Sequence, residues 1–142
     1  MSTEQPRITH IFISRQRDEP MIALEEAEVI ADWGLAGHRK SRPGSKRQIY
    51  LVDETTLASV DLQPGELTEN FTVRGMDVNA LREGQRLRIG TALLEITGPC
   101  TVCAHLELSR PGLKEALSGR RGVLARALES GTVRVGDEVQ VV

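Results

Sequence analysis

The chain has 142 residues and a mass of 15.6 kDa, which is the size of one folded domain, so we expect a single domain over residues 1–142. Its 18 basic and 20 acidic residues give a net charge of −2, which lacks the overall positive field of generic nucleic-acid binders and argues against a nucleic-acid partner. Only 3% of the residues are aromatic, so little is available for base stacking, and the core must be built from Val, Leu, Ile and Ala.

The sequence also carries no features of export or membrane insertion. The N-terminal residues are polar with an early acid, Glu4, and no apolar run follows that would make a secretory signal. The longest apolar runs are far shorter than the roughly 20 residues that a membrane-spanning helix needs. The two cysteines, Cys100 and Cys103, are therefore expected to be reduced thiols. We expect a soluble, cytoplasmic protein with no membrane partner.

The first half of the chain predicts two strands and a short helix. Residues 8–14 are rich in β-branched and aromatic side chains and predict a strand, and the polar residues that follow predict a turn. Residues 21–33 leave helix and strand open, because Ala and Glu favour a helix while the apolar spacing fits no single period. Residues 47–52 predict a buried strand, and Asp53 is placed to cap a short helix that extends to about Val60.

The second half predicts hairpins. Residues 86–97 alternate between apolar and polar on both sides of Gly90, which indicates a hairpin or a bent strand pair. Pro111 is placed to open a short helix. Residues 131–142 alternate across a Gly-Asp turn and predict a terminal hairpin. Many short strands separated by turn glycines favour a mainly β fold, a β-barrel with a few short peripheral helices.

Residues 39–47 form the densest charge feature. They carry five bases and no acid around a central Pro-Gly-Ser turn, namely Arg39, Lys40, Arg42, Lys46 and Arg47. Guanidinium groups and backbone amides near glycine suit phosphate or another oxyanion. A basic loop that serves only solubility is an equally good interpretation of the residues alone.

A pair of thiols follows the predicted strand that ends near residue 97. Cys100 and Cys103 lie in the run Gly-Pro-Cys-Thr-Val-Cys. A thiolate can ligate Mo, Zn or Cu, carry a persulfide sulfur or act as a nucleophile, provided that nearby cations lower its pKa. Zinc needs four ligands, and the chain offers this pair and three histidines, His10, His38 and His105. Two small buried apolar residues are the alternative interpretation.

A Pro-Gly turn at residues 64–65 leads through two acids to Asn70. The Asn70 amide can bind the edge of a heterocycle, or it can cap its own backbone as turn asparagines do. The residues alone favour the second interpretation.

Taken in chain order, these segments resemble the MOSC domain, which is named for the C-terminal part of molybdenum cofactor sulfurases. The run Gly-Leu-Ala-Gly-His-Arg at residues 34–39 is similar to the glycine-rich loop of the family, and residues 64–71 to its segment that ends in Glu-Asn. Cys103 falls where the signature cysteine of the family lies. The resemblance covers nearly the whole chain from about Thr9 onward.

Two residues depart from the family pattern. His38 stands where the family loop usually has an acid, and Val102 stands where many members have Pro before the signature cysteine. The Cys-x-x-Cys pair is similar to that of the amidoxime-reducing branch of the family, in which the second cysteine binds the metal.

The resemblance implies a MOSC β-barrel, similar to the pyruvate-kinase β-barrel, with a cleft that holds molybdenum cofactor. Cys103 is then both the metal ligand and the catalytic residue. The expected contacts to the anionic pterin are Arg39, Lys40, Arg42, Arg47, Asn70, Arg74 and Arg121.

Three functions remain open from the sequence. The first is a molybdenum-dependent reductase of a small N-hydroxylated substrate, which needs an electron donor protein because the chain has no flavin, haem or nicotinamide fingerprint. The second is a persulfide sulfur carrier charged by a cysteine desulfurase, with pyridoxal phosphate present only in that partner. The third is a barrel without turnover that binds an anion or is stabilised by zinc.

Overall fold

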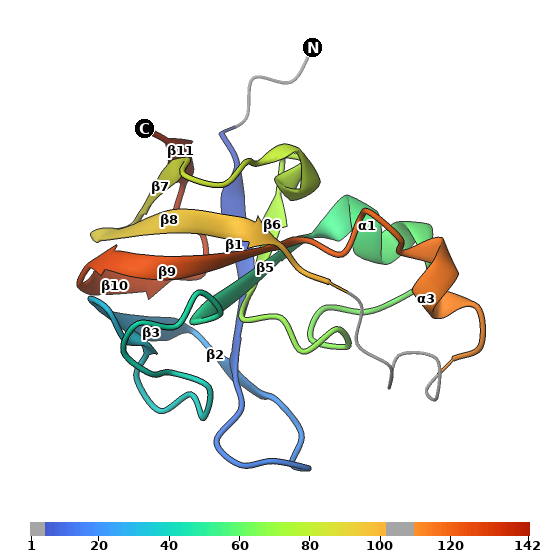
Figure 1. Cartoon of the computed structure of the whole chain (residues 1–142), viewed down its shortest axis with the longest axis horizontal. Helices are drawn as coiled ribbons and strands as arrows, with labels where there is room; N and C mark the ends of the chain where they lie inside the picture. The colour runs from blue at the N-terminus through green and yellow to red at the C-terminus, as the bar shows by residue number, and fades with distance from the viewer. Residues whose placement is uncertain (1–4, 102–109) are drawn as a thin grey trace.

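A computed structural model describes residues 5–101 and 110–142 of the chain, and Figure 1 shows a curled β-sheet with short helices at one end. The first strands are β1 (Arg7–Ile13), β2 (Ile22–Leu24), β3 (Glu26–Ile30), β4 (Gly34–Leu35), β5 (Ile49–Asp53) and β6 (Phe71–Arg74). The later strands are β7 (Arg86–Ile89), β8 (Ala92–Pro99), β9 (Val123–Glu129), β10 (Gly131–Arg134) and β11 (Val139–Val141). The helices are α1 (Glu54–Ser59), η1 (Val78–Ala80) and α3 (Leu113–Ala116).

The main sheet has eight strands in the order β11-β7-β8-β9-β5-β6-β1-β2. The pair β5 and β6 is parallel, with Leu51 opposite Phe71, because helix α1 and the following loop carry the chain back between them. The sheet curls so that the residues before β11 reach the start of β1, where the Ile8 amide donates to the Asp137 carbonyl at 2.9 Å and the Gly136 amide to the Ile8 carbonyl at 2.7 Å. The expected mainly β, barrel-like fold with few short helices is confirmed.

The predicted terminal hairpin is wrong. Strand β10 pairs with β3 in a second sheet of order β10-β3-β4, with Val133 opposite Ala27, whereas β11 pairs with β7 in the main sheet. The turn at Gly136 therefore carries the chain from one sheet to the other. Alternation along the sequence is equally consistent with both arrangements, since it reports the buried face of a strand but not the identity of its neighbour.

The structure decides the two alternatives for residues 21–33 in favour of strands β2 and β3. Ala27 and Val29 of β3 are buried while the glutamates on either side of Ala27 are exposed, which is the period-2 pattern of a half-buried strand. Pairing with β10 thus overrides the helix preference of Ala and Glu.

The core has two parts. The larger cluster fills the curl of the sheet with aliphatic side chains and Phe71, which is fully buried. The smaller cluster joins β5 to the helices and consists of Val52, Leu57, Leu62, Leu67, Leu113 and Leu117. Asp53 caps α1 as the sequence predicts, accepting the Thr56 amide on Oδ1 at 2.7 Å, and its Oδ2 accepts the Val78 amide at 3.0 Å. One buried carboxylate therefore fixes α1 and η1 to the end of β5.

In the described part of the chain, none of the helices has the length and apolar content that crossing a lipid bilayer requires.

Candidate functional site

Asn70 joins three strands at the point where β5, β6 and β1 meet. Its side-chain Oδ1 accepts the Tyr50 amide at 2.9 Å, and its Nδ2 donates to the Phe12 carbonyl at 3.1 Å. Its own backbone amide donates to the Tyr50 carbonyl at 2.9 Å, and its carbonyl accepts the Phe12 amide at 2.8 Å. The residue is 2% exposed, so the amide here binds neighbouring strands and not its own turn.

His38 packs against Asn70 at the base of the basic loop. Its Nδ1 lies 3.0 Å from the Ser14 amide nitrogen, and its Nε2 lies 3.4 Å from Asn70 Nδ2. Burial, followed by the positive charges of Lys40 and Arg39, lowers the pKa of His38 to about 4. The imidazole is therefore neutral at physiological pH, and Nδ1 must be unprotonated because it accepts a hydrogen bond.

This buried imidazole makes the fold sensitive to acid. An unfolded histidine takes up its proton near pH 6.5, so His38 stabilises the fold fully above that pH and loses its contribution as the pH falls from 6.5 towards 4. We expect a loss of about 3 kcal/mol in the free energy of unfolding. Urea unfolding at several pH values, followed by the fluorescence of Trp33, measures it.

His38→Asn keeps an acceptor for the Ser14 amide and should flatten this pH dependence. Gln63→Ala, at an exposed residue that carries no titratable group, is the control and should leave it unchanged. An equal slope in the wild type and His38→Asn would contradict the assignment.

Tyr50, Cys100 and Arg121 meet where β8 ends and β9 begins. The Tyr50 hydroxyl donates to the Arg121 carbonyl at 2.6 Å, and the Cys100 amide donates to the Gly122 carbonyl at 3.0 Å. Burial and the adjacent Cys100 thiol raise the pKa of Tyr50, and the positive charge of Arg121 partly opposes this increase. The tyrosine is therefore a neutral hydrogen-bond donor at this position.

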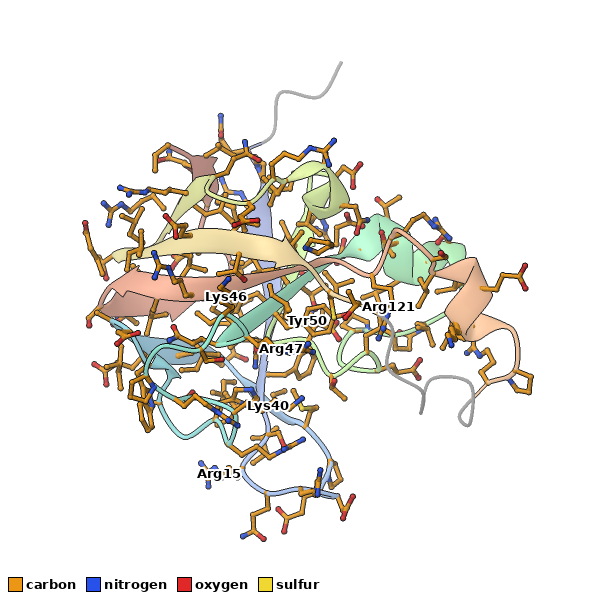
Figure 2. All side chains as sticks on the ribbon, viewed as in Figure 1. Arg15, Lys40, Lys46, Arg47, Tyr50 and Arg121 are labelled. Carbon is orange, nitrogen blue, oxygen red and sulfur yellow. The ribbon has the colours of Figure 1, made fainter. Side chains whose placement is uncertain are left out.

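Arg121 is an unusual cation because it is only 5% exposed. One of its terminal nitrogens, Nη1, donates to the Thr101 carbonyl at 2.6 Å, while Nε has no hydrogen-bond partner among the described residues. None of the ion pairs between described residues involves Arg121. A buried guanidinium is costly unless an anionic group offsets its charge, so this part of the structure suits an anionic ligand beside Cys100 and Thr101. Figure 2 shows Arg121 and Tyr50 close together, with Lys46 and Arg47 on the same face.

Glu69, next to Asn70, is another buried ionisable group in this region and is fully buried. Its Oε2 accepts the Gly65 amide at 2.9 Å and the Thr72 hydroxyl at 3.0 Å, whereas Oε1 has no partner within residues 5–101 and 110–142. Burial raises the pKa of this carboxyl, against the opposing effect of the backbone amides. Glu69 therefore fixes the Pro-Gly turn to the start of β6.

The basic loop lies on the surface beside this cluster. Arg39, Lys40, Arg42 and Arg47 are all exposed, and Arg39 is tied to the preceding loop through a 3.1 Å hydrogen bond from its Nε to the Ser14 hydroxyl. Figure 2 places Lys40 and Arg47 on the same side of the molecule as Tyr50. The structure therefore brings part of the predicted basic loop to the face that carries Arg121.

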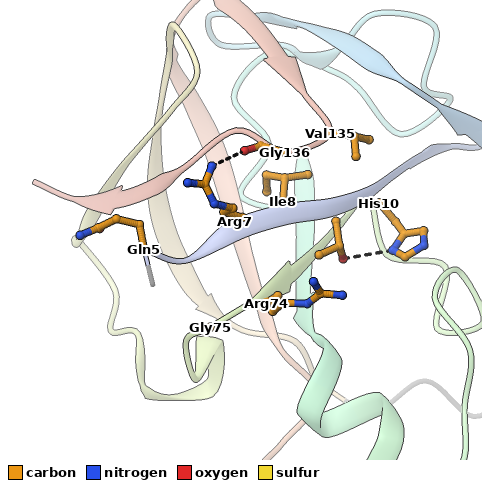
Figure 3. A pocket seen from close by; sticks show the side chains of 9 residues that line it. Gln5, Arg7, Ile8, His10, Arg74, Gly75, Val135 and Gly136 are labelled. Carbon is orange, nitrogen blue, oxygen red and sulfur yellow. Dashed lines mark hydrogen bonds between the residues drawn. The ribbon is translucent and has the colours of Figure 1, made fainter. Parts of the chain in front are cut away.

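Arg74 lies apart from this group, at the far end of β6 from Asn70. It is exposed and pairs with Glu54 at 2.8 Å, which holds the pKa of that carboxyl below its usual value. Arg74 lines a pocket of about 340 Å³, together with Arg7, His10 and the turn at Gly136 (Figure 3).

Cys103, the predicted metal ligand, and His105 lie outside the described residues. Within residues 5–101 and 110–142, His, Cys, Asp and Glu side chains form no group of three that suits a metal ion. Sequence reasoning missed Tyr50 and Glu69. The position of Glu69 next to Asn70 was a usable signal, whereas the contact of Tyr50 with Arg121 spans 71 residues and left no local trace.

Comparisons with known proteins identify the family and the fold. The sequence profile described as the MOSC domain matches residues 38–140. The crystal structure of the YuaD protein from Bacillus subtilis has 19% identity and a TM-score of 0.81, with 97% of this chain and 96% of that chain covered.

The YiiM protein from Geobacillus stearothermophilus has 18% identity and a TM-score of 0.79 over 96% of this chain and 75% of that chain. YiiM from Escherichia coli has 18% identity and a TM-score of 0.72, covering 96% of this chain and 69% of that chain. A comparison with curated proteins gives no match. These structures share the fold, and the profile match extends over most of the chain. The chain belongs to the MOSC domain family.

Proposed function

We propose that this protein binds molybdenum cofactor through Cys103 and reduces a small N-hydroxylated compound with electrons from a partner protein. The observation that supports it best is the buried Arg121, whose Nε has no partner in the described part of the chain and which contacts the segment leading directly to Cys103. A molybdopterin carries a phosphate, and a thiolate is a suitable soft ligand for molybdenum. An arginine and a thiol in neighbouring positions of the chain therefore support this choice of cofactor.

Each residue has a distinct part in this proposal. Arg121 would hold the anionic end of the cofactor, assisted by the exposed Arg39, Lys40, Arg42 and Arg47, and Cys103 would provide the thiolate. Tyr50 and Asn70 position this end of the site, because they fix the Arg121 carbonyl and the adjoining strands. The bound cofactor supplies two-electron chemistry at the metal. Reduction of an N–OH group then consumes two electrons and two protons and yields N–H and water.

Metal loading tests this proposal. The protein is expressed in a host that makes molybdenum cofactor, and the purified chain is analysed for metals and for mass. We expect about one Mo per chain in the wild type and in Cys100→Ser, and none in Cys103→Ser. Arg121→Gln should lower the Mo content, and Arg82→Gln, which makes the same charge change at an exposed residue, should not.

Other outcomes favour the other functions. One added sulfur on Cys103 after incubation with a cysteine desulfurase, without molybdenum, would support the persulfide carrier. Bound zinc would support the barrel without turnover. Loss of loading in Cys100→Ser but not in Cys103→Ser would show that the reactive thiol is Cys100.

A further inference from the structure

A band of exposed cations, the basic rim, lies on the face that carries Tyr50 and Arg121. It comprises Arg15, Arg39, Lys40, Lys46 and Arg47, all of them exposed. Figure 2 shows Lys46, Arg47, Lys40 and Arg15 on one side of the molecule, from the level of Tyr50 to the loop after β1. The two loops are joined, because the Arg39 amide donates to the Ser14 carbonyl at 2.7 Å and its side chain to the Ser14 hydroxyl.

Four members of the rim, Arg15, Arg39, Lys46 and Arg47, differ from the arginines of the sheet strands in their ion pairs. The described residues form six ion pairs, and in each an arginine of a sheet strand meets a glutamate: Arg7, Arg74, Arg86, Arg88, Arg126 and Arg134. None of the six involves Arg15, Arg39, Lys46 or Arg47. Clustered like charges repel and do not stabilise the fold. A negatively charged partner therefore explains this cluster better than a contribution to the stability of the fold does.

The extent of the rim decides which partner fits. The phosphate of a cofactor needs only a few cations, whereas the rim continues to Arg15 in a second loop. Single-stranded nucleic acid needs aromatic side chains for stacking, and Trp33 is the only aromatic among the exposed large hydrophobic side chains of the described ranges. The net charge of −2 also disfavours a long polyanion such as nucleic acid, which would contact acidic as well as basic parts of the surface. An acidic protein surface suits a rim of this kind best.

We propose that the basic rim is the docking surface for an acidic electron-carrying protein. This inference rests on the proposed function, which requires electrons from outside the chain. Each docking event oxidises a reduced one-electron carrier by one electron, so two events and two protons convert one N–OH group to N–H and water. Opposite charges on the two surfaces accelerate association and orient the carrier towards Tyr50 and Arg121.

Binding of a flavodoxin, an acidic carrier of flavin mononucleotide, tests the rim directly. Isothermal titration calorimetry of the full chain with oxidised flavodoxin should show binding at about 20 mM salt that weakens at least about tenfold at about 200 mM salt, because the Debye length shortens. Arg15→Glu combined with Lys46→Glu should weaken binding at low salt by about tenfold or more. Neither residue is among those assigned to the cofactor.

The matched control is Arg82→Glu combined with Arg86→Glu, which makes the same charge change near the start of β7. It should bind flavodoxin as the wild type does. Equal binding by the rim variant and the wild type, or no binding by the wild type at low salt, would overturn the proposal. So would tighter binding of phosphatidylserine vesicles or of a single-stranded RNA oligonucleotide than of flavodoxin.

A second donor separates this proposal from the function on which it rests. Reduced methyl viologen is a small cation that needs no docking surface. With reduced methyl viologen as donor, the molybdenum-loaded rim variant should reduce the N-hydroxylated substrate as the wild type does. With reduced flavodoxin as donor, it should lose most of this activity. If the wild type does not reduce the substrate with viologen, the proposed function is refuted. The calorimetric titration would still show whether the rim binds flavodoxin.

Discussion

Replacing Asn70 with alanine is expected to destabilise the protein by about 4 kcal/mol, since two backbone groups, one buried and one part-buried, lose their partners at about 1–3 kcal/mol each. These groups are the Tyr50 amide and the Phe12 carbonyl. They belong to strands β5 and β1, which Asn70 joins to β6. Urea unfolding followed by the fluorescence of Trp33 measures the loss.

Gln63→Ala is the control for this variant. Gln63 is exposed, and its side chain makes no hydrogen bond within the described residues, so its loss should cost less than about 0.5 kcal/mol. Asn70→Asp keeps an acceptor for the Tyr50 amide but sets a carboxyl oxygen against the Phe12 carbonyl, so it should also be destabilised relative to the wild type. A cost near that of Gln63→Ala would mean that Asn70 does not join the strands.

Local signals account for the elements that the sequence predicted well. Asp53 sits three residues before the amide that it caps, and the β7 and β8 hairpin closes around Gly90. In both cases the partners are neighbours in the chain, so their spacing carries the information. The pairing of β10 with β3 joins residues about a hundred positions apart, and no local pattern encodes it.

The same distinction applies to the site. The basic loop and Asn70 stand out by composition and by their order in the chain. The sequence groups Arg74 with Asn70 as an expected cofactor contact, because it follows Asn70 by only four residues. Four residues of extended strand span about 13 Å, and Arg74 lies at the far end of β6 from Asn70, where it pairs with Glu54. The position of Arg121 against Tyr50 depends on the pairing of β5 with β9, which only the folded sheet reveals.

The pairing of β5 with β9 makes Gly122 the other position at which a small change should have a large effect. Its φ is +86°, and a Cβ built there would lie 2.2 Å from the Leu51 carbonyl oxygen and 3.0 Å from Val52 Cγ2. That carbonyl belongs to β5, directly beside the ladder in which Leu51 faces Val123, so it cannot retreat without breaking the sheet. Gly122→Ala should therefore destabilise the protein by about 3 kcal/mol or more.

Gly119→Ala separates the two causes of this effect. Gly119 has a similar φ of +75°, but a Cβ there would meet nothing within 4 Å, so that variant should show only the backbone cost of about 1–2 kcal/mol. The difference between the two unfolding free energies measures the close approach of β9 to β5. Because the Gly122 carbonyl also accepts the Cys100 amide, Gly122→Ala should lower molybdenum loading even in the fraction that folds. Equal destabilisation by the two alanines would mean that the strands have room at Gly122 and that the site does not depend on this contact.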